Sequence, residues 1–174
     1  MALNPQVIGK TMPHGFAGCY ARQPDMIVET RPAGGTASIP FGAPLVYDAA
    51  KPGVVAAGAD FTAAKFVGVA GFEIKSALSY LDQGAGQYAP SEPVSVFQRG
   101  SINVKCSKGT PAVGGPVYIR VKANEAAPTA PVGGFEAEAD ETSSNTVQLT
   151  NCQWGGPADA NGIAELVILT KLNA

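Results

Sequence analysis

Residues that could carry out acid–base or nucleophilic chemistry are scarce in this sequence. His14 is the one histidine, and it lies in an irregular Met-Pro-His-Gly stretch near the N-terminus. Because histidine is the side chain most often recruited as a general acid or base, a Ser–His–Asp or Cys–His mechanism would depend on this one residue. We interpret His14 as an exposed or interface polar residue, and we predict a protein that is not an enzyme and has no catalytic residue.

The three cysteines, Cys19, Cys106 and Cys152, are widely separated in the chain. No C-x-x-C pair occurs, which argues against a zinc knuckle and against a thioredoxin-like redox motif. Cys106 lies on the apolar side of an alternating run, where a free thiol behaves as a small hydrophobic side chain. We therefore expect reduced, structural thiols.

The densest cluster of charge contains four carboxylates, Glu136, Glu138, Asp140 and Glu141. In an extended segment the first three would point to one side, as the ligands of a hard cation such as Ca²⁺ can. The spacing is not that of an EF-hand, and a polar Thr-Ser-Ser-Asn run follows directly. We favour a solvated loop, with a metal or partner site as the alternative, and we predict no cofactor and no bound metal.

Trp154, which precedes a Gly-Gly-Pro turn, has two interpretations. Its ring could be a platform on which a sugar stacks, or it could be a packing anchor, which we favour. Neither a G-x-G-x-x-G segment before a helix nor a G-x-x-x-x-G-K-[ST] segment occurs, so these phosphate-binding loops are not indicated. No pair of carboxylates stands out for glycoside hydrolysis.

Charge and hydropathy exclude further classes of function. The 174 residues include 12 basic and 14 acidic side chains, which are scattered and give a net charge of −2. Nucleic-acid binding needs a basic face, and none is visible. The longest apolar stretch, 163–169, is interrupted by Glu165 and is too short to span a bilayer. We expect no nucleic-acid partner, no membrane association, no signal peptide, and synthesis in the cytoplasm. Charged residues make up only 15% of the chain, which suggests that part of the surface is covered by a partner.

The elements that would position these residues are short strands separated by Gly and Pro turns. Apolar and polar residues alternate over 94–106 and again over 117–122, which predicts antiparallel strands with one face exposed to water. We predict a hairpin turn at Arg99–Gly100, between two alternating runs. Residues 163–170 are almost continuously apolar and predict a central strand buried on both faces.

Other segments complete the predicted fold. We predict a strand over 66–72 and a short helix or turn over 74–81, and both 41–47 and 113–118 resemble a glycine turn followed by proline and an apolar strand. The fold class is all-β: a single-domain antiparallel sandwich or barrel, jelly-roll-like, with an extended N-terminal arm. A jelly roll and a smaller barrel both remain open.

The predicted arm covers residues 1–24, and the β-rich domain covers 25–174. Three prolines and three glycines interrupt any helical or strand period in the arm. Its apolar residues nevertheless argue against a free tail, so we expect the arm to lie on its own domain or on a neighbour. These apolar residues are Leu3, Val7, Ile8, Phe16 and Tyr20.

The alternating segment 95–104, Ser-Val-Phe-Gln-Arg-Gly-Ser-Ile-Asn-Val, is followed at 114–119 by Gly-Gly-Pro-Val-Tyr-Ile. This arrangement resembles the capsid cement, or head decoration, proteins of tailed bacteriophages. The Phe-Gly-Ala-Pro-Leu-Val-Tyr segment at 41–47 and the Phe-Val-Gly-Val-Ala-Gly-Phe segment at 66–72 are similar to the upstream part of the same pattern. The resemblance covers roughly residues 40–120.

The resemblance implies a structural virion protein on the outer surface of the assembled phage head. Such a protein joins neighbouring major capsid subunits and strengthens the shell, and it acts as a homo-oligomer, either a dimer or a trimer. It implies no catalytic residues and no cofactor.

Our hypothesis for the partner interface combines the arm with two loops. It consists of Leu3, Val7, Ile8, Phe16, Tyr20, Arg31 and Trp154. The alternative function is a carbohydrate- or receptor-binding β-module exposed on the virion, suggested by the Gly-rich turns and the tryptophan. A hydrolase of unrecognised type is a third hypothesis.

Overall fold

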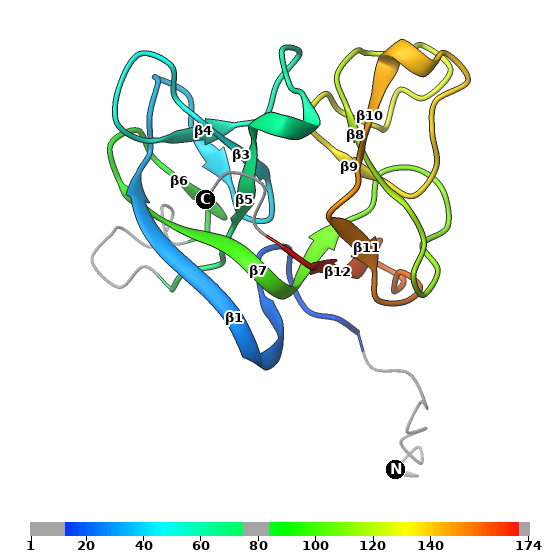
Figure 1. Cartoon of the computed structure of the whole chain (residues 1–174), viewed down its shortest axis with the longest axis horizontal. Coiled ribbons are helices and arrows are strands. Elements are labelled where there is room, and N and C mark those ends of the chain that lie inside the picture. Colours follow the sequence, from blue (N-terminus) through cyan, green and yellow to red (C-terminus); the bar gives the residue numbers. More distant parts are fainter. Residues whose placement is uncertain (1–12, 75–83, 171–174) are drawn as a thin grey trace, which may run out of the picture.

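The computed structural model describes residues 13–74 and 84–170. These residues form β-strands and two short 3-10 turns, η1 (Ala63–Lys65) and η2 (Ser143–Asn145) (Figure 1). The strands are β1 (Tyr20–Pro32), β2 (Ile39–Pro40), β3 (Pro44–Tyr47), β4 (Val54–Ala56), β5 (Phe66–Ala70), β6 (Gln87–Tyr88), β7 (Pro93–Lys105), β8 (Val117–Arg120), β9 (Phe135–Glu136), β10 (Thr146–Leu149), β11 (Cys152–Trp154) and β12 (Ile163–Ile168). The all-β prediction is confirmed. No helix in this part of the chain is long and apolar enough to cross a membrane.

The strands form three antiparallel sheets. The largest has the order β11-β12-β7-β5-β3-β4, and β1 pairs with β7 as its seventh strand. A three-stranded sheet has the order β10-β8-β9, and β2 pairs with β6 in a two-stranded sheet. The antiparallel prediction is therefore confirmed. Over the residues described, the large sheet does not close on itself, so the barrel alternative is wrong.

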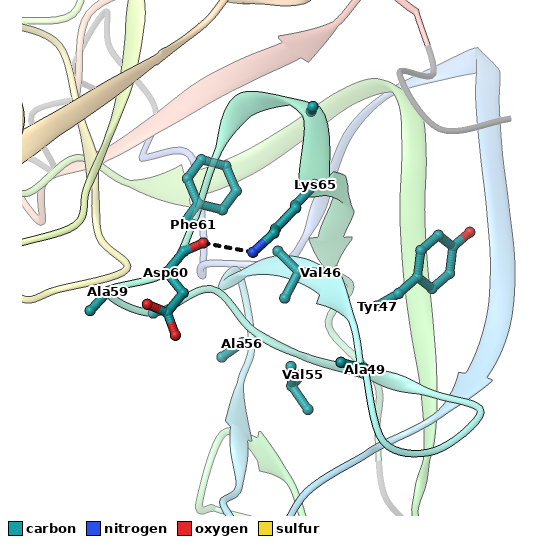
Figure 2. Close-up of a pocket in the computed structure, with 11 residues that line it drawn as sticks. Val46, Tyr47, Ala49, Val55, Ala56, Ala59, Asp60, Phe61 and Lys65 are labelled. Atoms are coloured by element: carbon teal, nitrogen blue, oxygen red, sulfur yellow. Dashed lines mark hydrogen bonds between the residues drawn. The ribbon is translucent and has the colours of Figure 1, made fainter.

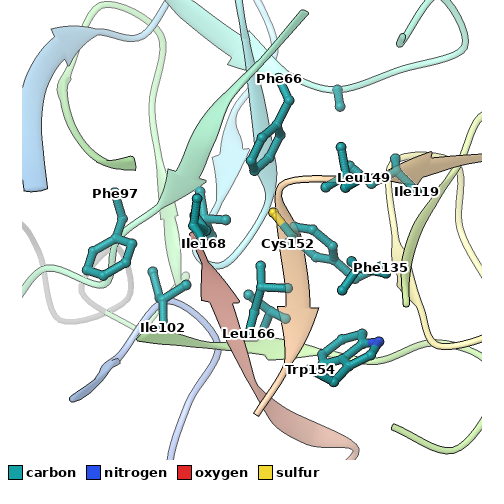
Figure 3. Packing of buried hydrophobic residues seen from close by; sticks show 14 of the residues in the cluster. Phe66, Phe97, Ile102, Ile119, Phe135, Leu149, Cys152, Trp154, Leu166 and Ile168 are labelled. Carbon is teal, nitrogen blue, oxygen red and sulfur yellow. The ribbon is translucent and has the colours of Figure 1, made fainter. Parts of the chain in front are cut away.

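Two hydrophobic clusters hold the sheets together. The larger lies between the seven-stranded and three-stranded sheets and includes Phe66, Phe97, Ile119 and Trp154 (Figure 3). The smaller includes Ile39, Leu45, Val54, Tyr88 and Val96, and it lies between the seven-stranded and two-stranded sheets. A strand presents successive side chains to opposite faces, so a central strand such as β5 must be apolar on both. All five residues of β5 are buried, as the prediction of a strand over 66–72 requires.

Strand β7 runs without interruption from Pro93 to Lys105, so the hairpin predicted at Arg99–Gly100 is wrong. Gly100 has φ +104°, and a Cβ at this position would collide with the carbonyl oxygen of Asp25 in β1. The glycine therefore serves a close approach between two strands at an irregularity of their pairing, where no turn is formed. A glycine between two alternating runs fits both a hairpin turn and one continuous strand, and the sequence pattern does not distinguish these two structures.

Other local predictions have mixed outcomes. Strand β12 lies between β11 and β7, so the predicted central strand is confirmed. Gly42 and Gly114 precede the prolines that lead into β3 and β8, and both have positive φ (+77° and +73°), so the two strands are entered by a similar turn. The helix or turn predicted over 74–81 lies almost entirely outside the described residues. The boundary of the predicted arm at residue 24 stays a prediction, and β1 passes through it.

Candidate functional site

Three phenylalanines from distant parts of the chain meet at the surface. Phe16 stacks on Phe72 with ring centroids 6.4 Å apart, and Phe41 meets Phe72 edge-on at 5.2 Å. Phe16 is 73% exposed and Phe72 is 36% exposed. We call Phe16, Phe41 and Phe72 the aromatic patch. Exposed aromatic side chains gathered in this way are characteristic of protein-binding surfaces, because they bury a large area on contact.

Two glycines allow the chain to bring these rings together. Gly18 (φ +86°) lies against Gly42 (φ +77°), and a Cβ on Gly18 would lie 2.8 Å from the backbone nitrogen of Phe72. The Gly42 N–H donates to Ala70 O (2.7 Å), and the Phe72 N–H donates to Gly18 O (2.8 Å). Only residues without side chains permit this backbone contact, so the glycines determine where the rings lie.

The aromatic patch is anchored to the smaller hydrophobic cluster. Phe41 meets the buried ring of Tyr88 edge-on at 5.0 Å, and Tyr88 Oη donates to Gly71 O (2.6 Å). The Tyr88 ring therefore supports the patch from below. Phe41 and Phe72 were missed from the sequence, although each of them, like Phe16, is adjacent to a glycine in the chain.

The structure locates two of the five arm residues of the predicted interface. Phe16 belongs to the aromatic patch, and Tyr20 begins β1, where its ring lies 5.3 Å from that of Phe97. Leu3, Val7 and Ile8 lie outside the described residues. The described part of the arm is hydrogen-bonded to its own domain, for example from Gly18 N to Asn103 O (2.7 Å).

Arg31 and Trp154 are not part of the aromatic patch. Arg31, near the far end of β1 from Tyr20, forms an ion pair with Glu29 (2.5 Å) and lies over the Tyr47 ring at 5.8 Å. Trp154 is fully buried in the larger cluster (Figure 3), so its interpretation as a packing anchor is confirmed. A ring that is covered on all sides cannot stack on a sugar in this conformation.

His14 is half-buried and joins the arm to the loop before β12. Its backbone N–H donates to Asp159 Oδ2 (2.9 Å), its ring Nε2 lies 3.2 Å from Pro157 O, and its carbonyl accepts from Asn103 Nδ2 (2.6 Å). Desolvation acts to raise the pKa of Asp159, but hydrogen bonds from the backbone N–H groups of Ile163, His14 and Asn161 together outweigh it and lower the pKa. These contacts fix the path of the arm.

The acidic cluster is not a solvated loop, contrary to our interpretation. Glu136 and Asp140 are buried around the buried guanidinium of Arg120, which bonds to both oxygens of Glu136 and lies 2.9 Å from Asp140 Oδ2. Hydrogen bonds from Asn124 and from the Thr142 N–H, together with Arg120, hold the pKa of Asp140 below its usual range. Opposite charges can be buried in this way because each compensates the desolvation of the other.

The outer carboxylates of this cluster face solvent. Glu138 is exposed and lies 3.5 Å from Lys108, and Glu141 is also exposed. In the described part of the chain, no group of three or more His, Cys, Asp or Glu side chains could hold a metal ion. The buried part of the cluster, in which Arg120 pairs with Glu136 and Asp140, joins β8 to β9 and to the loop that follows β9.

The cysteines are unpaired, as the sequence predicted. Cys152 is buried, and desolvation raises the pKa of its thiol to about 12. Desolvation also raises the pKa of Cys106. Both thiols are therefore protonated at neutral pH and behave as small apolar groups.

A groove of about 580 Å³ lies beside the β3–β4 edge of the large sheet (Figure 2). Its lining is mostly aliphatic, with Val46, Val55, Ala56 and Phe61 among its walls. Lys65, from η1, donates from Nζ to the backbone oxygen of Asp60 at its rim (3.0 Å). A groove of this size and lining suits a few aliphatic side chains.

Comparisons with known proteins connect this fold with phage capsids. The family model for the "Structural cement protein (E217 gp24/Pam3 gp6)" matches residues 4–169. A solved structure described as "The capsid of Myoviridae Phage XM1" superposes with a TM-score of 0.66 at 17% sequence identity, covering 99% of both chains, which shows a shared fold. No curated protein sequence matches significantly. The resemblance found in the sequence is confirmed: this chain belongs to the family of phage structural cement proteins, with a structural role in stabilising the capsid.

Proposed function

We propose that this protein binds the outer surface of the assembled phage head and cements neighbouring major capsid subunits. The observation that carries the proposal is the match of a structural cement family over nearly the whole chain, together with a full-length fold match to a protein of a myovirus capsid. The low content of charged residues agrees with a surface that is covered in the virion. Its role is structural, without catalysis or cofactor.

The aromatic patch is the part of the described surface best suited to contact the capsid. Phe16 projects from the arm and is supported from below by Phe72 and Phe41, so its ring is both exposed and held in place. Exposed and rigid aromatic side chains are enriched among residues that dominate binding energy, because little conformational freedom is lost on contact. Phe16 and Tyr20 of the predicted interface therefore stay in the proposal, and Phe41 and Phe72 are added.

The experiment is co-sedimentation of purified protein with capsid shells from the same phage, followed by densitometry. We expect a saturable band at a fixed ratio to the coat protein, and Phe16→Ala should weaken binding by roughly tenfold or more. Val113→Ala is the matched control, since Val113 is 81% exposed and is not part of the patch. Absence of wild-type binding would refute the proposal. Equal binding by Phe16→Ala and Val113→Ala would show that the contact with the capsid lies outside the aromatic patch.

The alternative of a carbohydrate- or receptor-binding module is not favoured. Its motivating residue, Trp154, is buried and cannot offer a stacking face. The homo-oligomer expected from the family resemblance stays a prediction, and so do the absence of nucleic-acid and membrane partners and the synthesis in the host cytoplasm.

A further inference from the structure

Strand β1 lies at an edge of the large sheet. Within residues 13–74 and 84–170, the strand that pairs with β1 is β7, and no described strand runs along the opposite side of β1 (Figure 1). From Ile27 to Arg31 this edge contains neither lysine nor proline, the residues with which proteins commonly protect a sheet edge. Ile27 and Val28 are 41% and 37% exposed. An exposed edge of this kind can accept a further strand.

The register shows which backbone groups of β1 face outward. Thr30 lies opposite Ser95, whose carbonyl accepts from Gly71 N (2.7 Å) on the side of β5. Val28 lies opposite Phe97, which also pairs with β5. In an antiparallel ladder, two facing residues either bond to each other or both point away from each other. Val28 and Thr30 therefore direct their backbone groups away from β7, and each offers one donor and one acceptor.

This edge is continuous with the surface proposed to contact the capsid. The Tyr20 ring lies 5.3 Å from that of Phe97, and its hydroxyl lies beside Gly71, where an added Cβ would be 3.2 Å from it. Gly71 precedes Phe72 of the aromatic patch. Facing residues of an antiparallel pair share one side of the sheet, so Val28 and Phe97 lie on the same side. Tyr20 thus connects the aromatic patch to the β1 edge.

We propose that the β1 edge binds an extended segment of a major capsid subunit, which adds to the large sheet as a further strand. The inference rests on the proposed function and specifies how the subunit is held, namely by main-chain hydrogen bonds to Val28 and Thr30. The family match gives this chain a structural role in the capsid, and the edge adjoins the patch that the subunit would contact. A capsid subunit seated on the patch would therefore reach β1.

The side chains of β1 indicate the chemistry of the segment. Successive side chains alternate between the two sides of a strand, so Val28 and Thr30 lie on one side. Glu29 and Arg31, which form an ion pair, lie on the other. Backbone bonds give affinity when a strand is added to an edge, and the side chains give selectivity. The complementary segment has apolar or β-branched residues on the first side and charged or polar residues on the second.

Hydrogen exchange of the wild-type protein tests whether the capsid covers these backbone groups. Single-residue mass spectrometry compares the amides of Val28 and Thr30 in free protein and on capsid shells from the same phage. We expect rapid exchange in the free protein, and slowing by about tenfold or more on shells. Shell binding that leaves both amides at the rate of the free protein would overturn this inference alone. Failure to bind shells would overturn it together with the proposed function.

Proline at position 30 tests the same contact by substitution. Thr30→Pro removes an N–H that faces outward, a position where edge strands tolerate proline. Thr30→Ala is the matched control, because it shortens the side chain and keeps the N–H. We expect Thr30→Pro to co-sediment with shells about tenfold or more weakly than Thr30→Ala, since a carbonyl of the added strand loses its donor. Equal binding by these two variants would overturn the proposal.

A third variant checks the register on which the proposal depends. Arg31→Pro removes an N–H that faces β7, so it should be less stable in urea than Thr30→Pro. The reverse order of stability would overturn the assignment of outward groups, and the proposal with it.

A second copy of the chain is the other candidate for this edge. Hydrogen exchange of the free protein at two concentrations separates it from a capsid segment. We expect the amides of Val28 and Thr30 to exchange at the same rate at both concentrations. Protection that increases with concentration, in the absence of shells, would assign the edge to a second copy and overturn the proposal.

Discussion

Replacing Gly18 by alanine tests whether close backbone packing builds the aromatic patch. Gly18 has φ +86°, and its new Cβ would lie 2.8 Å from Phe72 N and 2.9 Å from Ala70 O. Positive φ costs an L-residue about 1–2 kcal/mol, and overpacking against groups that cannot move costs about 1–3 kcal/mol more. We therefore expect Gly18→Ala to lower the free energy of unfolding by about 2–5 kcal/mol, and to displace Phe16 from Phe72.

Gly15 supplies a matched control in the same segment. It has φ +95°, but a Cβ there would have no neighbour within 4 Å, so Gly15→Ala should cost only the strain of about 1–2 kcal/mol. Urea unfolding of both variants, followed by tryptophan fluorescence, measures the difference. If Gly18→Ala is no less stable than Gly15→Ala, the contact among Gly18, Ala70 and Phe72 does not hold the arm, and the reasoning is refuted.

Four further predictions concern the interior. Arg120→Met strands two buried carboxylates and should lower the free energy of unfolding by about 3–5 kcal/mol, whereas unchanged urea unfolding would contradict the burial of this cluster. The pKa of Asp140 is lower in the folded protein than in the unfolded chain, so its contribution to the free energy of unfolding is present above pH about 4 and is lost as the pH falls below that value. Acid titrations of wild type and Arg120→Met would compare this loss of stability in the two proteins. Val104→Asp places an unpaired charge among fully buried residues and should lower the melting temperature markedly; a wild-type melting temperature would contradict the register of β7. Cys152, with its pKa raised to about 12, should resist a maleimide until the protein is unfolded, and mass spectrometry showing rapid labelling in the native protein would contradict its burial.

The alternating strands could be predicted from the sequence because their information is local. The period of two in 94–106 and 117–122 correctly predicts antiparallel strands, but the water-exposed face predicted with it is wrong for most of β7, where the polar side chains Gln98, Ser101 and Asn103 are buried. The continuous apolar run of β12 likewise reports burial on both faces. The interruption at Gly100 was misinterpreted because its cause, the backbone of Asp25, lies 75 positions earlier in the chain.

Long-range pairing explains what the sequence did not reveal about the candidate site. Glu136 and Asp140 look like a solvated acidic run until Arg120, 16 and 20 positions earlier, is placed between them. The aromatic patch likewise joins Phe16 to Phe72, which are 56 positions apart. Local propensity carries no information on such contacts, and they arise only when the fold brings the segments together.

The most direct test of the central claim is the thermal stability of capsid shells, measured by scanning calorimetry with increasing amounts of this protein. A cement that joins neighbouring subunits should raise the shell disassembly temperature and reach a plateau at the ratio where binding saturates, because a ligand stabilises the state that binds it. Saturable binding with an unchanged disassembly temperature would contradict the account.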